Sequence, residues 1–205
     1  MARKTSTKRP TAQEMEKIAR PYLMALGRVA FTWNGLQDSL AFLFWKALGI
    51  SNGGVAMAIW QSVQSDKSQR DMLRAAVRKT ALWHLNFPKA TEDIEWLLAE
   101  TDKLSNKRND ALHAPFGMTT QETGEISLEL WTFTLSLRAA NLRGKHVLEE
   151  FDRYANTAVK LHAYSKTLFA ALASPPQIAW PERPLLPTSR QTSGSQSRRF
   201  PTKNK

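Results

Sequence analysis

The run of apolar residues between Tyr22 and Leu48 constrains the fold more than any other part of the chain. Large apolar side chains recur there every three or four positions, the spacing that lines one face of an α-helix. These positions are Leu26, Val29, Trp33, Leu36, Leu40, Leu43, Phe44 and Leu48. A long helix with one apolar face needs other helices to cover it, so the sequence predicts a helical bundle. Gly49 is expected to end the helix, because glycine readily adopts the left-handed C-cap conformation.

Capping signals predict the other helices. Thr11 and Glu14 form a capping-box pattern for a short first helix, and Pro21 suits the first turn of the long helix after it. Further helices are expected over residues 53–63, from Ser65 or Asp66 to about Trp83, from about 88 to the stop at Pro115, and from about 145 to 172.

The period changes after Pro115. Residues 116–120 and 126–134 are strand-like, and the polar segment Gln-Glu-Thr-Gly-Glu lies between them, which predicts a β-hairpin. The predicted fold class is therefore mainly α: an antiparallel helical bundle with a short β-hairpin inserted before the last long helix.

The net charge of +11 is concentrated at the two ends of the chain. Residues 1–9 contribute +4 and residues 174–205 contribute +5, which leaves +2 for the body. The segment from 174 holds six of the ten prolines and has no apolar periodicity. We therefore predict a basic disordered tail over 1–10, one helical domain over 11–173, and a Pro/Ser/Arg-rich disordered tail over 174–205. Such tails either hold a polyanion without sequence preference or only solubilise the protein, and Trp180 would be a docking residue within the second tail.

Composition excludes several classes of protein. The chain has no cysteine, so disulfide frameworks, thiolate metal sites and a cysteine nucleophile are excluded. Its four histidines form no metal-binding pair of the H-x-x-x-H type, and no metal or cofactor is predicted. No apolar stretch approaches the roughly 18 residues of a membrane span, and the basic N-terminus lacks the apolar region of a secretory signal. These features predict a soluble, cytoplasmic protein with no membrane partner.

A basic stripe is expected on the helix that follows Ser65. Arg70, Arg74 and Arg78 are four residues apart and therefore share one helix face, which could contact phosphates. The simpler interpretation, which the sequence favours, is a solvated face that pairs with Asp66 and Asp71.

The segment Arg108-Asn109-x-x-x-His113 is the best candidate for a functional site. Asn109 and His113 are four residues apart on one helix face, so Asn109 could hold the imidazole in one orientation. The guanidinium of Arg108 suits a phosphate, and Lys107 could add a second phosphate contact. His113 lies in the last helical turn and could give or take a proton at neutral pH. Together these groups suit attack of a 2′-hydroxyl on a phosphodiester.

The spacing from arginine to histidine is a weak signal by itself, since Arg78 and His84 also satisfy it. The asparagine directly after the arginine singles out Arg108. A plain helix C-terminus, in which Lys107, Arg108 and His113 complement the helix dipole, is the structural alternative.

Arg108-Asn109-x-x-x-His113 at the end of a long helix, followed by a hairpin and a last helix, resembles the HEPN superfamily. The run Arg28-Val-Ala-Phe-x-Trp33-Asn34-x-Leu36-Gln37-x-x-Leu40 also resembles the opening helix of bacterial HEPN-like proteins, and the similarity covers about residues 20–172. The resemblance implies a HEPN-like bundle that forms a homodimer. It further implies a metal-independent endoribonuclease of a toxin–antitoxin or phage-defence system, with RNA as its substrate and a cognate antitoxin as a partner.

By position, the resemblance gives each motif residue a role. Arg108 would bind the scissile phosphate, Asn109 would support it, and His113 would act on the 2′-hydroxyl, leaving a 2′,3′-cyclic phosphate. Two His113 side chains would meet in one cleft if the dimer is isologous. Gln37 stands where many relatives carry glutamate. The alternative is a non-catalytic HEPN-like module that binds a partner protein, a nucleotide or a nucleic acid.

Overall fold

Six helices and one β-hairpin form the described part of the computed structural model, which comprises residues 11–80, 86–120, 125–130, 137–174 and 179–188. The helices are α1 (Ala12–Leu48), α2 (Gly53–Ser62), α3 (Asp66–Lys79), α5 (Ala90–His113), α6 (Leu137–Leu142) and α7 (Val147–Ala173). The strands β1 (Phe116–Thr120) and β2 (Ile126–Leu130) lie between α5 and α6. This confirms the predicted fold class, mainly helical with a short hairpin before the last long helix.

Helix α1 begins and ends at the predicted caps. The Thr11 hydroxyl accepts a hydrogen bond from the Glu14 N–H, and the Glu14 carboxylate accepts one from the Thr11 N–H. Gly49 ends the helix in the left-handed conformation, with φ of 65°. The prediction that a new helix starts at Pro21 is wrong, because α1 continues through it. A proline removes one backbone N–H and costs stability, but it does not force a helix to end.

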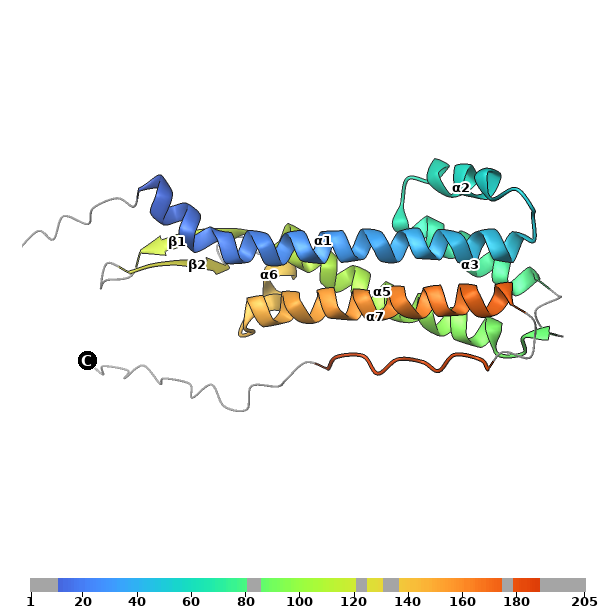
Figure 1. Cartoon of the computed structure of the whole chain (residues 1–205). Coiled ribbons are helices and arrows are strands. Elements are labelled where there is room, and N and C mark those ends of the chain that lie inside the picture. The colour runs from blue at the N-terminus through green and yellow to red at the C-terminus, as the bar shows by residue number, and fades with distance from the viewer. Residues whose placement is uncertain (1–10, 81–85, 121–124, 131–136, 175–178, 189–205) are drawn as a thin grey trace, which may run out of the picture.

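Helices α1 and α7 are parallel and lie side by side along most of their length (Figure 1). Arg28 forms an ion pair with Asp152 at 2.7 Å, and about four turns further on Phe42 meets Phe169 edge-on at 5.7 Å between ring centroids. Helix α5 runs in the opposite direction to both (Figure 1). The first and last long helices therefore pack directly against each other, although they are far apart in sequence.

Helix α3 also runs parallel to α1, because α2 carries the chain back along the outside of the bundle (Figure 1). At the start of α3, Asp66 accepts a hydrogen bond from the Trp33 indole N–H at 2.9 Å. At its end, the Thr80 hydroxyl donates to the Ala47 carbonyl at 2.7 Å. The start of α3 is thus held at the middle of α1, near the candidate site.

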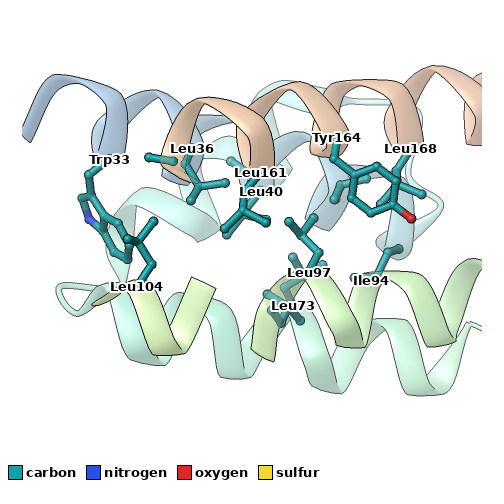
Figure 2. Packing of buried hydrophobic residues seen from close by; sticks show 14 of the residues in the cluster. Trp33, Leu36, Leu40, Leu73, Ile94, Leu97, Leu104, Leu161, Tyr164 and Leu168 are labelled. Carbon is teal, nitrogen blue, oxygen red and sulfur yellow. The ribbon is translucent and has the colours of Figure 1, made fainter. Parts of the chain in front are cut away.

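The hydrophobic core fills the space between α1, α3, α5 and α7 (Figure 2). Leu36, Leu40, Leu97 and Leu161 are fully buried there. Each such side chain contributes about 1.5–3 kcal/mol through its removal from water. Trp33 lies beside Leu104 at one end of this core (Figure 2) and is only 1% exposed.

The hairpin and α6 cover the end of the bundle at which α5 stops. β1 and β2 pair antiparallel, with Phe116 opposite Leu130. The Phe116 ring contacts Tyr22 of α1 and Phe151 of α7, so the hairpin is anchored on both long helices. Helix α6 was not predicted, and residues 131–134 of the predicted second strand lie outside the described residues.

Residues 179–188, which we call the C-terminal strap, lie against the bundle, and this corrects the prediction of disorder for that part of residues 174–205. Trp180 donates a hydrogen bond to Asp93, and Arg183 pairs with Asp93 and with Glu92. Trp180 and Leu186 also pack against the hydrophobic core. A proline-rich segment can therefore be ordered in an extended form when its few large side chains find partners. Residues 1–10 and 189–205, also predicted to be disordered, lie outside the described residues.

None of the helices described above is both long enough and apolar enough to span a membrane.

Candidate functional site

The guanidinium of Arg108 is directed into the bundle. The buried residues of α5 include Leu97, Leu104 and Ala111, and Arg108 follows Leu104 by four residues and precedes Ala111 by three. It therefore stands on the core-facing stripe and is half-buried. Its guanidinium carbon lies 5.5 Å from the centre of the Trp33 ring, a cation–π distance, and its Nε atom is buried with no hydrogen-bond partner among the described residues.

Asn109 is hydrogen-bonded to Arg108 and, within the described part of the chain, forms no hydrogen bond with His113. The Arg108 Nη1 atom donates to the Asn109 Oδ1 atom at 2.9 Å. His113 is exposed in the last turn of α5, and within the described residues it forms no hydrogen bond or ion pair. Five residues turn an α-helix by about 140°, so Arg108 and His113 leave α5 in clearly different directions. The structure therefore brings Arg108 and Asn109 together and leaves His113 apart.

Lys107 and Asp110 are the other charged residues at this end of α5. Burial lowers the pKa of Lys107, and the nearby positive charge of Arg153 lowers it further. Asp110 accepts a hydrogen bond from Asn141 at 2.8 Å and lies 3.8 Å from Arg138, so it fixes α6 against α5. Lys107 and Arg108 are thus half-buried, and the exposed His113 follows them by six and five residues on the same helix.

The predicted basic stripe on α3 is paired with acids. Arg70 is 2% exposed and its Nε atom contacts Asp102 at 2.7 Å. Arg74 bonds to Asp102 and also to Asp71 and Glu95, and Arg78 bonds to Glu95 at 2.6 Å. The pairs with Asp102 and Glu95 join α3 to α5. Asp71 is a partner as the simpler interpretation expects, whereas Asp66 accepts from Trp33 instead.

Trp33 connects the stripe to the motif. The guanidinium carbon of Arg70 lies 5.6 Å from the centre of the Trp33 ring, nearly the same distance as that of Arg108. One indole ring therefore contacts two guanidinium groups from two different helices. Arg70 also has a buried Nη1 atom without a hydrogen-bond partner in the described chain.

Sequence reasoning did not find these contacts of Arg108. The spacing from Leu104 to Arg108 to Ala111 is a signal for a core-facing position and could have indicated that the arginine points inward. Gln37 is likewise core-facing: it is 7% exposed, and neither of its side-chain amide atoms has a partner among the described residues.

Within the described residues, no three histidine, aspartate or glutamate side chains come together as a group that could hold a metal ion. Comparison of the chain with protein-family models, with curated proteins and with solved structures finds no match to any of them.

Proposed function

We propose that the chain is a HEPN-type endoribonuclease that acts as a homodimer, with Arg108, Asn109 and His113 as its site. The observation that carries the proposal is the exposed imidazole of His113 at the end of α5, one to two turns from two cationic side chains, Lys107 and Arg108. An exposed histidine without a fixed partner is available to exchange protons with a substrate.

The chemistry requires two proton-transfer groups. In the proposed reaction one His113 takes the proton of a 2′-hydroxyl, and the 2′-oxygen attacks the adjacent phosphorus. The bond from phosphorus to the 5′-oxygen breaks, and the His113 of a second copy gives that oxygen a proton. The products are a 2′,3′-cyclic phosphate and a free 5′-hydroxyl. Since one chain has one His113, the reaction needs a homodimer in which the two sites face each other.

In this proposal Arg108 binds the scissile phosphate, and Lys107 adds a second positive charge. In the structure the Nη1 atom of Arg108 is bonded to Asn109 and its guanidinium lies against Trp33. To bind the phosphate, Arg108 must give up the bond to Asn109 and part of its contact with Trp33. The long side chain permits this movement without any change in the helix. The charged phosphate would replace the Asn109 Oδ1 atom, which is neutral and therefore a weaker hydrogen-bond acceptor.

The position of Arg108 also favours a second candidate function. A guanidinium held against a buried tryptophan stabilises the fold, and it does so without any substrate. The motif would then belong to a non-catalytic HEPN-like module that binds a partner protein, a nucleotide or a nucleic acid. In either case a toxin–antitoxin or phage-defence role, in the cytoplasm and with a cognate antitoxin, is the proposed context.

The deciding experiment measures cleavage of a mixed RNA pool in EDTA by the wild type, His113→Ala and Arg108→Ala. Loss of a proton-transfer group typically lowers the rate by about a hundred- to ten-thousand-fold, and that is the result we expect for His113→Ala. His146→Ala is the matched control, because His146 is also an exposed histidine at a helix end. Mass spectrometry of the fragments should find 2′,3′-cyclic ends. Equal rates for wild type and His113→Ala would rule out the catalytic role, and a dimer that cleaves nothing would support the binding module.

A further inference from the structure

The outward-facing side of α1 carries large apolar side chains that the described part of the chain leaves uncovered. Phe31 is 80% exposed, Met24 is 66% exposed and Leu23 is 63% exposed. Phe31 follows the other two by seven and eight residues, about two helical turns, so all three lie on one side of the helix. Single exposed apolar side chains are normal on a protein surface, whereas several large ones gathered on one helix face indicate a contact surface.

Gly27 lies among these side chains and leaves a notch in the apolar face. It follows Leu23 by four residues and precedes Phe31 by four, and a Cβ built on it would meet nothing within 4 Å. A large side chain from another molecule can therefore approach the backbone of α1 at this point. The exposed ring of Phe31 is of the size that fills such a notch.

Opposite charges stand at the two ends of the same face. Arg20 and Asp38 are both exposed, and neither forms an ion pair or a hydrogen bond with any residue that the structure describes. They are eighteen residues apart, which is five full helical turns, so they point to the same side of α1. A helix face with a free base at one end and a free acid at the other is complementary in charge to an antiparallel copy of itself.

One antiparallel register satisfies both the charges and the notch. Arg20 and Asp38 lie nine residues on either side of position 29, and Gly27 and Phe31 lie two residues on either side of it. A two-fold axis at position 29 therefore pairs Arg20 with Asp38 of the second copy and sets Phe31 into the notch at Gly27 of that copy, and each contact occurs twice. We propose that α1 pairs in this way with α1 of a second copy of the chain.

The strength of the contact follows from its size. One helix from each copy contributes less than the roughly 800 Å² per partner of a typical stable interface, so we expect a dissociation constant on the order of micromolar. The two Phe31 rings are the expected main contributors, because each would leave water and enter the notch of the other copy.

This contact is separate from the dimer of the proposed function, and the inference does not rest on that function. Trp33, whose ring contacts Arg108, follows Phe31 by two residues, which turns the helix by about 200°. The apolar face of α1 is therefore directed away from the candidate site. A chain that makes both contacts would form tetramers or longer assemblies, because two different two-fold contacts on one chain do not end at a dimer.

Sedimentation equilibrium of the full-length protein over a wide concentration range tests the role of Phe31. Phe31→Ala should weaken the association by about thirtyfold or more, because it removes a ring from both sides of the contact. Leu185→Ala is the matched control: Leu185 is a large apolar side chain that is 89% exposed on the C-terminal strap. It should associate like the wild type. A monomeric wild type, or Phe31→Ala that associates like Leu185→Ala, would overturn the proposal.

Charge reversal tests the register. Arg20→Glu and Asp38→Arg each place like charges together at both ends of the contact, so each should weaken the association by about tenfold. The double variant has the net charge of the wild type and should restore the association. Arg20 and Asp38 are about 27 Å apart within one helix, so a rescue can only arise between copies. A double variant that associates no better than either single variant would contradict the register.

Disulfide cross-linking checks the pairing directly, because the chain has no cysteine. Met24 and Asn34 are exposed and lie five residues on either side of position 29, so each should face the other across the axis. Met24→Cys with Asn34→Cys should cross-link two copies on mild oxidation. Each single variant should not, because its two cysteines would be about 15 Å apart along the axis, too far for a disulfide.

The cross-linking result also separates this inference from the proposed function. Single variants that cross-link as readily as the double variant would show random collision and overturn the pairing. A dimer that persists in Phe31→Ala and gives no cross-link in the double cysteine variant would overturn this inference alone, and it would leave the dimer with facing His113 side chains as the remaining assembly.

Discussion

Arg108→Ala should destabilise the protein even in the absence of any RNA. The substitution removes a cation–π contact with Trp33, worth about 0.5–2 kcal/mol, and a hydrogen bond to Asn109, worth about 0.5–1.5 kcal/mol. The two together predict a loss of about 1–3.5 kcal/mol in the free energy of unfolding. For a chain of this size that corresponds to a fall in Tm of about 2–4 °C for each kcal/mol.

Chemical denaturation followed by tryptophan fluorescence measures this loss. Arg20→Ala is the control, because Arg20 is exposed on α1 and should change the stability by less than about 0.5 kcal/mol. A double-mutant cycle with Trp33→Leu then isolates the contact between the two side chains, for which we expect a coupling of about 0.5–2 kcal/mol. If Arg108→Ala is as stable as Arg20→Ala, or the coupling is zero, the guanidinium is not held by Trp33 as described. The result also decides how the cleavage assay is interpreted, since Arg108→Ala must be compared with the wild type well below both Tm values.

Three further substitutions test the rest of the fold. Asp102→Asn should lower the free energy of unfolding by about 2–3 kcal/mol, because it weakens the main partner of the buried guanidinium of Arg70. Burial of Glu150 raises its pKa, but hydrogen bonds from Arg153 and Tyr154 outweigh this effect and hold the pKa below its usual 4.5. The ionised Glu150 carboxylate therefore stabilises the fold above about pH 4.5, and this stabilisation is lost as the pH falls through the folded-state pKa. Glu150→Gln should accordingly lower Tm at neutral pH and much less in strong acid. Gly27→Ala should raise stability by about 0.5–1 kcal/mol, since a Cβ there meets nothing within 4 Å and alanine favours the helix.

Each of these has a result that would contradict it. Asp71→Asn is the comparison for Asp102→Asn, because Asp71 pairs, among the described residues, only with Lys67 and Arg74 of its own helix. An equal loss of unfolding free energy in the two variants would show that Arg70 does not need an acidic partner. A difference between Glu150→Gln and wild type that grows as the pH falls would reverse the sign of the argument. Gly53→Ala is the counterpart of Gly27→Ala, because its Cβ would lie 2.9 Å from the Trp45 ring. Equal effects of the two glycine substitutions would contradict the packing at α2.

Local signals in the sequence predicted most of the elements, α6 excepted, whereas the contacts between distant segments were not predictable from them. Thr11, Ser65 and Gly49 each cap a helix as expected, because a cap involves only neighbours within a few residues. The partner of Arg108 is Trp33, on another helix, and no spacing rule connects the two. An arginine on an apolar stripe can point inward or reach out to solvent, and only the neighbouring helices decide between these positions.

The C-terminal strap is a second case in which contacts between distant segments decided the structure and the sequence prediction failed. Composition predicted disorder for residues 174–205, because proline-rich segments with few apolar residues rarely bury enough surface to offset the entropy of ordering. Trp180 and Arg183 nevertheless find Asp93, which lies 87 and 90 residues earlier in the chain. A buried carboxylate, whose role is invisible in the sequence, thus anchors this segment together with the ion pair of Arg183 with Glu92 and the packing of Trp180 and Leu186 on the core.

The parallel pairing of α1 with α7 has a consequence for how the protein is made. Arg28 and Asp152, which pair across this contact, are 124 residues apart in the sequence. Contacts of such long range slow folding, because the chain must close a large loop before they form. During synthesis α1 emerges with its apolar face uncovered and waits for nearly the whole domain before α7 can cover it. The nascent chain therefore exposes the part of this face that α7 covers for most of its time on the ribosome, which is the interval in which chaperones would bind it and in which aggregation competes with folding.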